Sequence, residues 1–190
     1  MHLDNFHGAY AAVNYLIELG HRKIGLLSGG PKWSSGIYRE RGYLAALKKY
    51  GIPCDPQLQY NGAFTNLGGQ MGAKVLIDRD PNLTAIFAAS DEMAMGAVKA
   101  ISELGLAVPE DISVIGFDGH DIGRNAPVPL TTVEADPLSV GATACEMLIG
   151  MLESNSSEVA KVVIDVKLCV RGTTGPPKFQ LESEKGGRVS

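Results

Sequence analysis

Short apolar segments alternate with longer segments of helical periodicity over the first two-thirds of the chain, and this alternation constrains the fold more than any other feature. Each short segment is flanked by glycine, proline or polar residues. Strands that are apolar along their whole length are buried on both faces, and helical crossovers join them as parallel neighbours. The predicted strands are Ile24–Ser28, Leu58–Asn61, Ala85–Ala88 and Ser113–Phe117. The pattern predicts an α/β fold with a doubly wound parallel sheet.

Four helices accompany these strands, and capping residues indicate where they begin and end. We expect Asp4 to cap the first helix and Gly20 to end it. Asn66 is expected to cap the third helix, and the fourth is expected to begin at Ser90 or Asp91. The predicted apolar faces are Ala9, Ala12, Val13, Leu16 and Ile17 in the first helix; Tyr43, Leu47 and Tyr50 in the second, which spans about Gly36 to Tyr50; Leu67, Met71 and Val75 in the third; and Met93, Ala97, Ile101 and Leu104 in the fourth.

The alternation changes after the fourth strand. Thr131–Glu134 is expected to be extended, and Asp136 followed by a proline is a typical helix start. The helix expected over Pro137–Leu152 is followed by a further strand over Val162–Val166, and the residues from 175 on predict a disordered tail. The apolar face of this helix is Val140, Ala144, Met147, Leu148 and Met151.

Composition and missing motifs exclude several classes of function. The net charge is −4, and the 17 basic residues are scattered, so the chain offers no positive face for nucleic acid. No apolar run could cross a bilayer, the first residues do not form a secretory signal, and the 3 cysteines lack metal or redox spacing. The nucleotide-binding patterns GxxxxGK[ST] and GxGxxG and the hydrolase pattern GxSxG are absent. We therefore expect a cytoplasmic protein that is not an enzyme, without membrane contact, cofactor or metal.

Polar and aromatic residues follow each predicted strand. Ligands of open parallel sheets bind beyond the carboxyl ends of the strands, because the loops there emerge at one edge. Carboxylates and a guanidinium can pair with adjacent hydroxyl groups, and aromatic rings can stack on a sugar ring, so this set of residues suits a polyol. The candidate site residues are Trp33, Ser35 and Arg39 after the first strand, Phe64 after the second, Ser90 after the third and Asp118 after the fourth.

Structural roles remain open for several of these residues. Asp91 can serve mainly as a helix cap. Trp33 suits either ligand contact or subunit packing, and Phe64 either ligand contact or the core. Arg39 can occupy an ordinary surface position, whereas Asp118 ends an apolar strand, where a carboxylate needs partners.

Several segments also resemble the C-terminal part of the LacI/GalR family of bacterial transcription regulators. The resemblance covers about 170 residues in the family's order and spacing, and only the tail lies outside it. The similar segments are DNFHGAYAAVNYLIELGHRKIGLLSGG (Asp4–Gly30), RERGYLAAL after Tyr38, AIFAASDEMAMGAVKAISELGLAVPEDISVIGFDG (Ala85–Gly119), PLTTVEAD (Pro129–Asp136) and LCVRGTT (Leu168–Thr174). The resemblance implies a periplasmic-binding-protein-like fold and places the family's effector contacts on the same six candidates, of which Arg39 and Asp118 match best. Ser90 stands where many members of the family have an asparagine.

The resemblance also implies how the chain is organised. Residues 1–130 would form the C-terminal effector-binding subdomain, 131–158 a helix crossing to an absent N-terminal subdomain, 159–174 a return strand and 175–190 the tail. The implied function is that of a homodimeric regulator in which a small-molecule effector, a sugar or a sugar derivative, acts allosterically on DNA binding by an absent helix-turn-helix headpiece. The alternatives are a periplasmic sugar-binding protein of an uptake transporter and, less well supported, an α/β enzyme.

Overall fold

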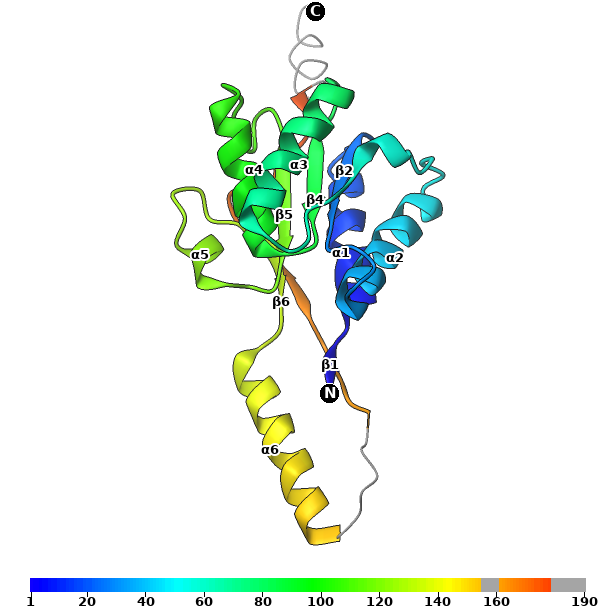
Figure 1. Ribbon diagram of the computed structural model, residues 1–190, viewed down its shortest axis with the longest axis vertical. Coiled ribbons are helices and arrows are strands. Elements are labelled where there is room, and N and C mark those ends of the chain that lie inside the picture. Colours follow the sequence, from blue (N-terminus) through cyan, green and yellow to red (C-terminus); the bar gives the residue numbers. More distant parts are fainter. Residues whose placement is uncertain (155–160, 179–190) are drawn as a thin grey trace, which may run out of the picture.

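Six strands form the central sheet of the computed structural model, which describes residues 1–154 and 161–178 (Figure 1). The strand order is β3-β2-β4-β5-β6-β8; all neighbours are parallel except β8, which runs antiparallel to β6. The strands are β1 (His2–Leu3), β2 (Ile24–Ser28), β3 (Gln59–Asn61), β4 (Ala85–Ala88), β5 (Ser113–Phe117), β6 (Thr131–Glu134), β7 (Val163–Ile164) and β8 (Lys167–Cys169). The helices are α1 (Asn5–Glu18), α2 (Ser34–Lys49), α3 (Asn66–Arg79), α4 (Asp91–Glu103), α5 (Asp121–Arg124) and α6 (Pro137–Ser154), with a 3₁₀ turn at Pro56–Leu58.

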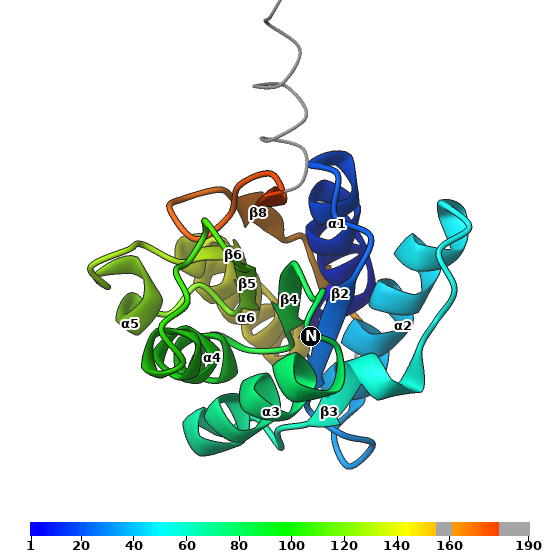
Figure 2. The ribbon, with the colours of Figure 1, turned by 90° about the horizontal axis from the view of Figure 1, so that it is seen from above.

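Helices cover both faces of the sheet, as the sequence predicts. Figure 2 shows α1 and α2 on one side and α3 and α4 on the other. Alternate residues of β4 point to opposite faces: Phe87 packs with the α1 and α2 side, and Ile86 with the α3 and α4 side. The predicted doubly wound α/β fold is confirmed, with one antiparallel edge strand added.

The first helix follows its sequence signals closely. The Asp4 carboxylate accepts a hydrogen bond from the backbone N–H of His7 at 3.0 Å, and all five residues of the predicted apolar face are buried. Gly20 then ends the helix with a φ of 105°, a left-handed conformation that glycine adopts without strain. In α6, the carboxylate of Asp136 likewise accepts from the N–H of Ser139 at 3.1 Å.

The predicted apolar face of α3 is wrong. Leu67 and Met71 are 64% and 51% exposed, whereas glycines, Ala73 and Leu76 form the buried face. A Cβ at Gly69 would lie 2.1 Å from the carbonyl oxygen of Met93, so α3 and α4 approach more closely than larger residues allow. The hydrophobic periodicity therefore predicted the helix but not the face that packs.

Other boundaries differ in detail. Thr65, not Asn66, caps α3 through a hydrogen bond to its hydroxyl from the N–H of Gly68 at 2.9 Å. Tyr50 lies just beyond α2, partly exposed, and its hydroxyl donates to Asn14 at 3.1 Å. The predicted apolar face of the second helix is therefore wrong at Tyr50, because an aromatic ring with a polar hydroxyl group can lie at the surface.

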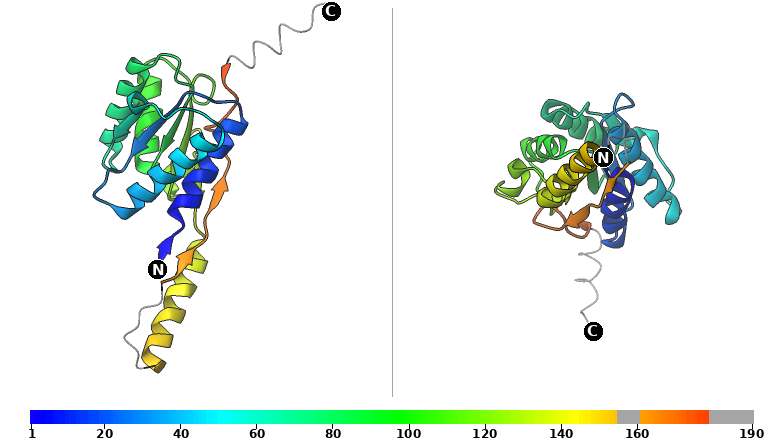
Figure 3. Two further views of the ribbon diagram at one scale, coloured as in Figure 1. Left: turned by 90° about the vertical axis from the view of Figure 1, so that its right-hand side faces the viewer. Right: turned by 90° about the horizontal axis from the view of Figure 1, so that it is seen from below.

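The segments after β5 return to the main sheet. Thr131–Glu134 pairs with β5, and Lys167–Cys169 pairs with β6, so the sheet includes the first residues of the segment predicted as the crossover. Helix α6 lies outside the body, and β7 pairs with β1 beside it (Figures 1 and 3). The division into subdomain, crossover and return segment remains a prediction.

Part of the predicted disordered tail packs against the body. The Gly175 carbonyl lies 2.8 Å from Nε2 of His21, and Lys178 forms an ion pair with Asp111. His21 is buried, and this burial lowers its pKa, so the ring is neutral with Nε2–H donating to Gly175. Residues 179–190 lie outside the described residues.

The close contact of α3 and α4 gives a first prediction. Gly69→Ala forces its new methyl group against the Met93 carbonyl, and we expect a loss of about 1–3 kcal/mol in the free energy of unfolding. Urea denaturation followed by circular dichroism measures this loss. Gly141→Ala, where a Cβ meets nothing within 4 Å, is the control and should cost nothing. Equal stability of the two variants would contradict the packing argument.

Candidate functional site

The carboxyl ends of the central strands open onto a cavity of about 290 Å³. Loops after β2, β3, β4 and β5 all contribute to it, as expected for a parallel sheet. The residues that line it are Trp33, Ser35, Arg39, Phe64, Ser90, Glu92, Asp118 and His120. The structure therefore brings all six candidates from the sequence to one cavity.

Arg39 is the most constrained residue of this wall. It extends from α2 and is only 5% exposed, so its predicted alternative as a surface residue is wrong. Its Nε donates to the side chain of Asn5 at 2.7 Å, its Nη1 to the Ala89 carbonyl at 2.6 Å, and its Nη2 lies 2.9 Å from Oδ1 of Asp118. Three protein oxygens thus engage three of the five N–H groups of the guanidinium.

Burial and the charge of Asp118 shift the pKa of Arg39 in opposite directions. Removal from water lowers its pKa, and the negative charge of Asp118 raises it, with burial the larger effect. The guanidinium also lies 3.7 Å from the centre of the Phe117 ring, a favourable cation–π distance. A buried cation is stable only when paired and hydrogen-bonded, and Arg39 meets both conditions.

Asp118 directly follows β5 in an unusual backbone conformation. Its φ is 115°, which is rare for a residue other than glycine, and its N–H donates to the Val133 carbonyl at 2.8 Å. Backbone strain of this kind occurs where surrounding structure holds a functional side chain in place. Here it directs one carboxylate oxygen to Arg39 while the side chain remains partly exposed at the cavity.

Ser90, not Asp91, caps α4. The Ser90 hydroxyl accepts from the N–H of Met93 at 3.3 Å, so this candidate ligand residue also has a structural role. Asp91 is fully buried beneath the cavity, where it accepts from the Thr132 hydroxyl at 2.5 Å and from the backbone N–H of His120 at 2.7 Å. Burial raises the pKa of Asp91 to about 6, and its two hydrogen bonds lower it only in part.

The two aromatic candidates differ in burial. Phe64 has a φ of 59° and lies against Gly29, where a Cβ would come 2.0 Å from the ring. It both packs on the core and lines the cavity, so neither of its two predicted roles excludes the other. Trp33 is 53% exposed at the rim, where its ring is available to a ligand or a second subunit.

The six candidates from the sequence do not include three contributors to the site, although one of them, His120, follows the fourth predicted strand. Glu92 lines the cavity from the first turn of α4, and its carboxylate has no hydrogen-bond or ion-pair partner within the described part of the chain. His120 also lines the cavity, and Asn5 orients Arg39 from the start of α1. The position of Glu92 after a strand was a usable signal, whereas the role of Asn5 depends on a contact between distant segments.

This arrangement can bind a small polar molecule. Arg39 and Asp118 both line the cavity, and the contacts described above leave two N–H groups of the guanidinium and one carboxylate oxygen for a ligand. A hydroxyl group both donates and accepts, so this pair can supply both kinds of partner. The Phe64 and Trp33 rings add apolar surface for a ring stacked between polar contacts. Across residues 1–154 and 161–178, no three His, Cys, Asp or Glu side chains are grouped so as to hold a metal ion.

Comparison with known proteins places this geometry in a family. The family model described as a periplasmic binding protein-like domain matches residues 13–174. The chain belongs to this family. It is 37% identical over 174 residues to the HTH-type transcriptional repressor CytR of Escherichia coli strain K12, an alignment that covers 92% of this chain and 51% of CytR.

Solved structures agree with this assignment. The chain is similar to the transcriptional regulator CelR in complex with cellobiose, with a TM-score of 0.83 and 33% identity over 90% of this chain and 52% of CelR. It is also similar to a LacI family regulator of Enterococcus faecium with bound ribose, with a TM-score of 0.84 and 30% identity over 92% of this chain and 64% of that one. The family resemblance inferred from the sequence is confirmed, and the chain is homologous to LacI-family repressors. It spans about half the length of the curated relatives it matches.

No helix within the described residues is both long and apolar enough to cross a bilayer.

The raised pKa of Asp91 predicts a pH-dependent contribution to stability. Because the folded state binds this proton more tightly than the unfolded chain, the contribution is complete below about pH 4 and is lost as pH rises through 6. The loss approaches about 3 kcal/mol on the scale of 1.36 kcal/mol per pKa unit. Asp91→Asn should therefore gain stability relative to the wild type between pH 4 and pH 7 in urea titrations.

Asp111→Asn is a control for which the expected pH dependence of stability has the opposite sign. Lys178 lowers the pKa of Asp111, so the wild-type advantage at this position should be lost as pH falls. A pH-independent difference between the wild type and Asp91→Asn would contradict the assignment of Asp91.

Proposed function

We propose that this chain is the effector-sensing domain of a LacI-family transcription regulator and that its effector is a small sugar or a related polyol. The observation that carries the proposal is the Arg39–Asp118 ion pair at one wall of the cavity. The same cavity is lined by all six residues expected from the sequence, which include this pair. Relatives solved with cellobiose and with ribose support a sugar-like effector. Homology to transcriptional repressors favours a regulator over a periplasmic transport protein and over an enzyme.

In this proposal the six residues have different roles in binding the effector. Arg39 and Asp118 bind hydroxyl groups, with Ser35 and Ser90 as smaller hydrogen-bonding partners. Phe64 and Trp33 contact the apolar face of the ring. The short reach of the Ser90 side chain leaves more space there than a longer polar residue would.

The rest of the regulator lies outside these 190 residues. We propose that α6 crosses to a second subdomain that completes the cleft, that β7 and β8 return from it, and that the protein is a cytoplasmic homodimer. DNA binding is assigned to a separate headpiece, because the relatives are HTH-type regulators and this chain has a net charge of −4. Effector binding then shifts the dimer between conformations that position the headpieces differently.

A thermal-shift panel on the complete regulator tests the proposal. Monosaccharides, cellobiose, nucleosides and their phosphates are added at millimolar concentration, and a ligand at 100 times its Kd stabilises the native state by about 2.7 kcal/mol. At least one polyol should raise the melting temperature and change affinity for operator DNA. If no compound of these classes does either, the proposal fails.

Asp118→Asn tests the hydroxyl-binding role directly. The substitution keeps the shape of the side chain and removes its charge, and a hydrogen bond to a charged group contributes about 1.5–3 kcal/mol. We therefore expect effector affinity to fall roughly 10- to 100-fold by calorimetry. Asp78→Asn, the same chemical change on the exposed face of α3, is the control and should bind as the wild type does. Unchanged affinity in Asp118→Asn would remove Asp118 from the site.

A further inference from the structure

Asp91 is the only carboxylate that is fully buried among residues 1–154 and 161–178. Both of its hydrogen-bond donors are uncharged: the Thr132 hydroxyl at 2.5 Å and the backbone N–H of His120 at 2.7 Å. A buried carboxylate is normally paired with a cation, because charge is costly to remove from water. The raised pKa of Asp91 means that this charge lowers the stability of the fold at neutral pH.

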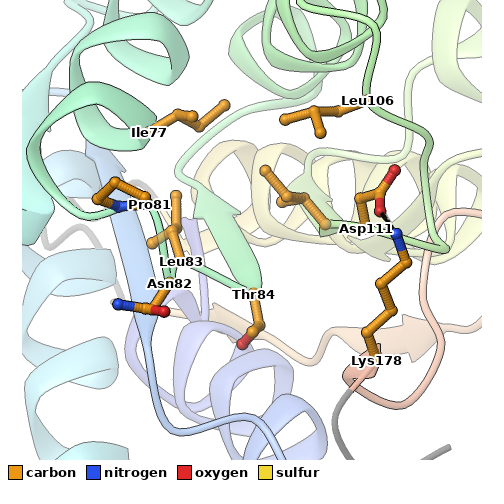
Figure 4. Close-up of a pocket in the computed structure, with 9 residues that line it drawn as sticks. Ile77, Pro81, Asn82, Leu83, Thr84, Leu106, Asp111 and Lys178 are labelled. Atoms are coloured by element: carbon orange, nitrogen blue, oxygen red, sulfur yellow. Dashed lines mark hydrogen bonds and ion pairs between the residues drawn. The ribbon is translucent and has the colours of Figure 1, made fainter. Parts of the chain in front are cut away.

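The opposite edge of the sheet carries a carboxylate with a cationic partner. Thr84 directly precedes β4 and Ile112 directly precedes β5, and both line a cavity of about 210 Å³ at the amino ends of these strands. Figure 4 shows Asp111 beside this cavity in an ion pair with Lys178. The hydrogen bond from Lys178 lowers the pKa of Asp111, so this charge adds to stability at neutral pH. The two carboxylates thus have opposite effects on the fold.

The partners of Asp91 lead to the loop that carries Asp118. His120, two residues after Asp118, donates its backbone N–H directly to the Asp91 carboxylate. The other donor, Thr132, lies in β6, where the next residue, Val133, accepts from the N–H of Asp118 at 2.8 Å. Strand β6 therefore holds this loop at two points: at Asp118 directly, and at His120 through Asp91.

The backbone between these two points is strained. The φ angles of Asp118 and Gly119 are 115° and 75°, in the left-handed range that favours glycine. A residue other than glycine stays in this range only where surrounding contacts hold it there. In this conformation Oδ1 of Asp118 lies 2.9 Å from Nη2 of Arg39, the pair on which the proposed effector site depends. The contacts of the loop with β6 and with Asp91 therefore act on the orientation of Asp118.

We propose that Asp91 is a positioning residue of the effector site: its carboxylate holds the loop of residues 118–120 so that Asp118 faces Arg39 and the cavity. This role rests on the proposed function, because it concerns binding of the same effector. A hydrogen bond to a charged acceptor is shorter and about twice as strong as one between neutral groups. The carboxylate therefore holds the N–H of His120 more firmly than an uncharged side chain of the same size would. Functional sites commonly retain features that cost stability.

Asp91→Asn in the complete regulator separates binding from stability. Burial raises the pKa of Asp91 to about 6, so removal of the charge should raise the melting temperature at pH 7. The probe is the polyol that gives the largest thermal shift in the panel of monosaccharides and cellobiose. Its affinity should fall roughly 5-fold by calorimetry, because a neutral amide holds the loop less firmly. Unchanged or tighter binding would overturn the proposal, as would a parallel fall in affinity and melting temperature, which indicates general damage to the fold.

Asp111→Asn is the matched control, because it makes the same chemical change at the opposite edge of the sheet. It removes the partner of Lys178, so the melting temperature at pH 7 should fall. The same polyol should bind this variant as tightly as it binds the wild type. Weaker binding would show that affinity follows stability and would overturn the proposal.

Hydrogen exchange reports on the loop directly and needs no effector. Asp91→Ala removes the acceptor of the His120 N–H, so exchange of this amide should accelerate about 10-fold or more. Asp91→Asn keeps an acceptor oxygen and should cause a smaller change. The Gly62 amide, which donates to the Ser28 carbonyl at 2.9 Å, should exchange at the wild-type rate in both variants. Unchanged exchange at His120 in Asp91→Ala would overturn the proposal, whereas failure of every polyol to bind the wild type would contradict the proposed function.

Discussion

One buried guanidinium joins the segments on which the proposed effector site is built. Arg39 extends from α2 and reaches the start of α1 through Asn5, the end of β4 through Ala89 and the end of β5 through Asp118. Because an unpaired buried cation is costly, these partners are held together as a set. The wall of the cavity is therefore organised before any ligand arrives.

Asp91 provides a similar connection on the other side of the site. Its carboxylate joins the start of α4 to β6 through Thr132 and to the loop after β5 through the backbone of His120. Gly116 leaves room for this carboxylate, since a Cβ there would lie 2.3 Å from it. A buried acid with two such partners positions the loop that carries Asp118, and its raised pKa reflects the cost of that burial.

Some segments of the chain lie outside the α/β body (Figure 1). Helix α6 extends away from the sheet, with Leu148 61% exposed and Leu152 82% exposed, and the short β1–β7 pair lies beside it. Apolar side chains exposed in this way are typical of surfaces that pack against another part of a protein. In the proposed regulator, a second subdomain covers them, and closure around the effector is transmitted through the same connections.

The sequence by itself determined the alternation of strands and helices, the doubly wound sheet and the edge at which polar residues gather. These follow from local periodicity, capping residues and the geometry of parallel strands, which is why Asp4, Gly20 and the six candidate residues could be identified in advance. Only the tertiary structure decided which face of α3 is buried, that Ser90 rather than Asp91 caps α4, and that Asn5 orients Arg39. Each of these depends on contacts between residues far apart in the sequence, and no local pattern encodes how closely two helices approach or which partner a buried charge finds.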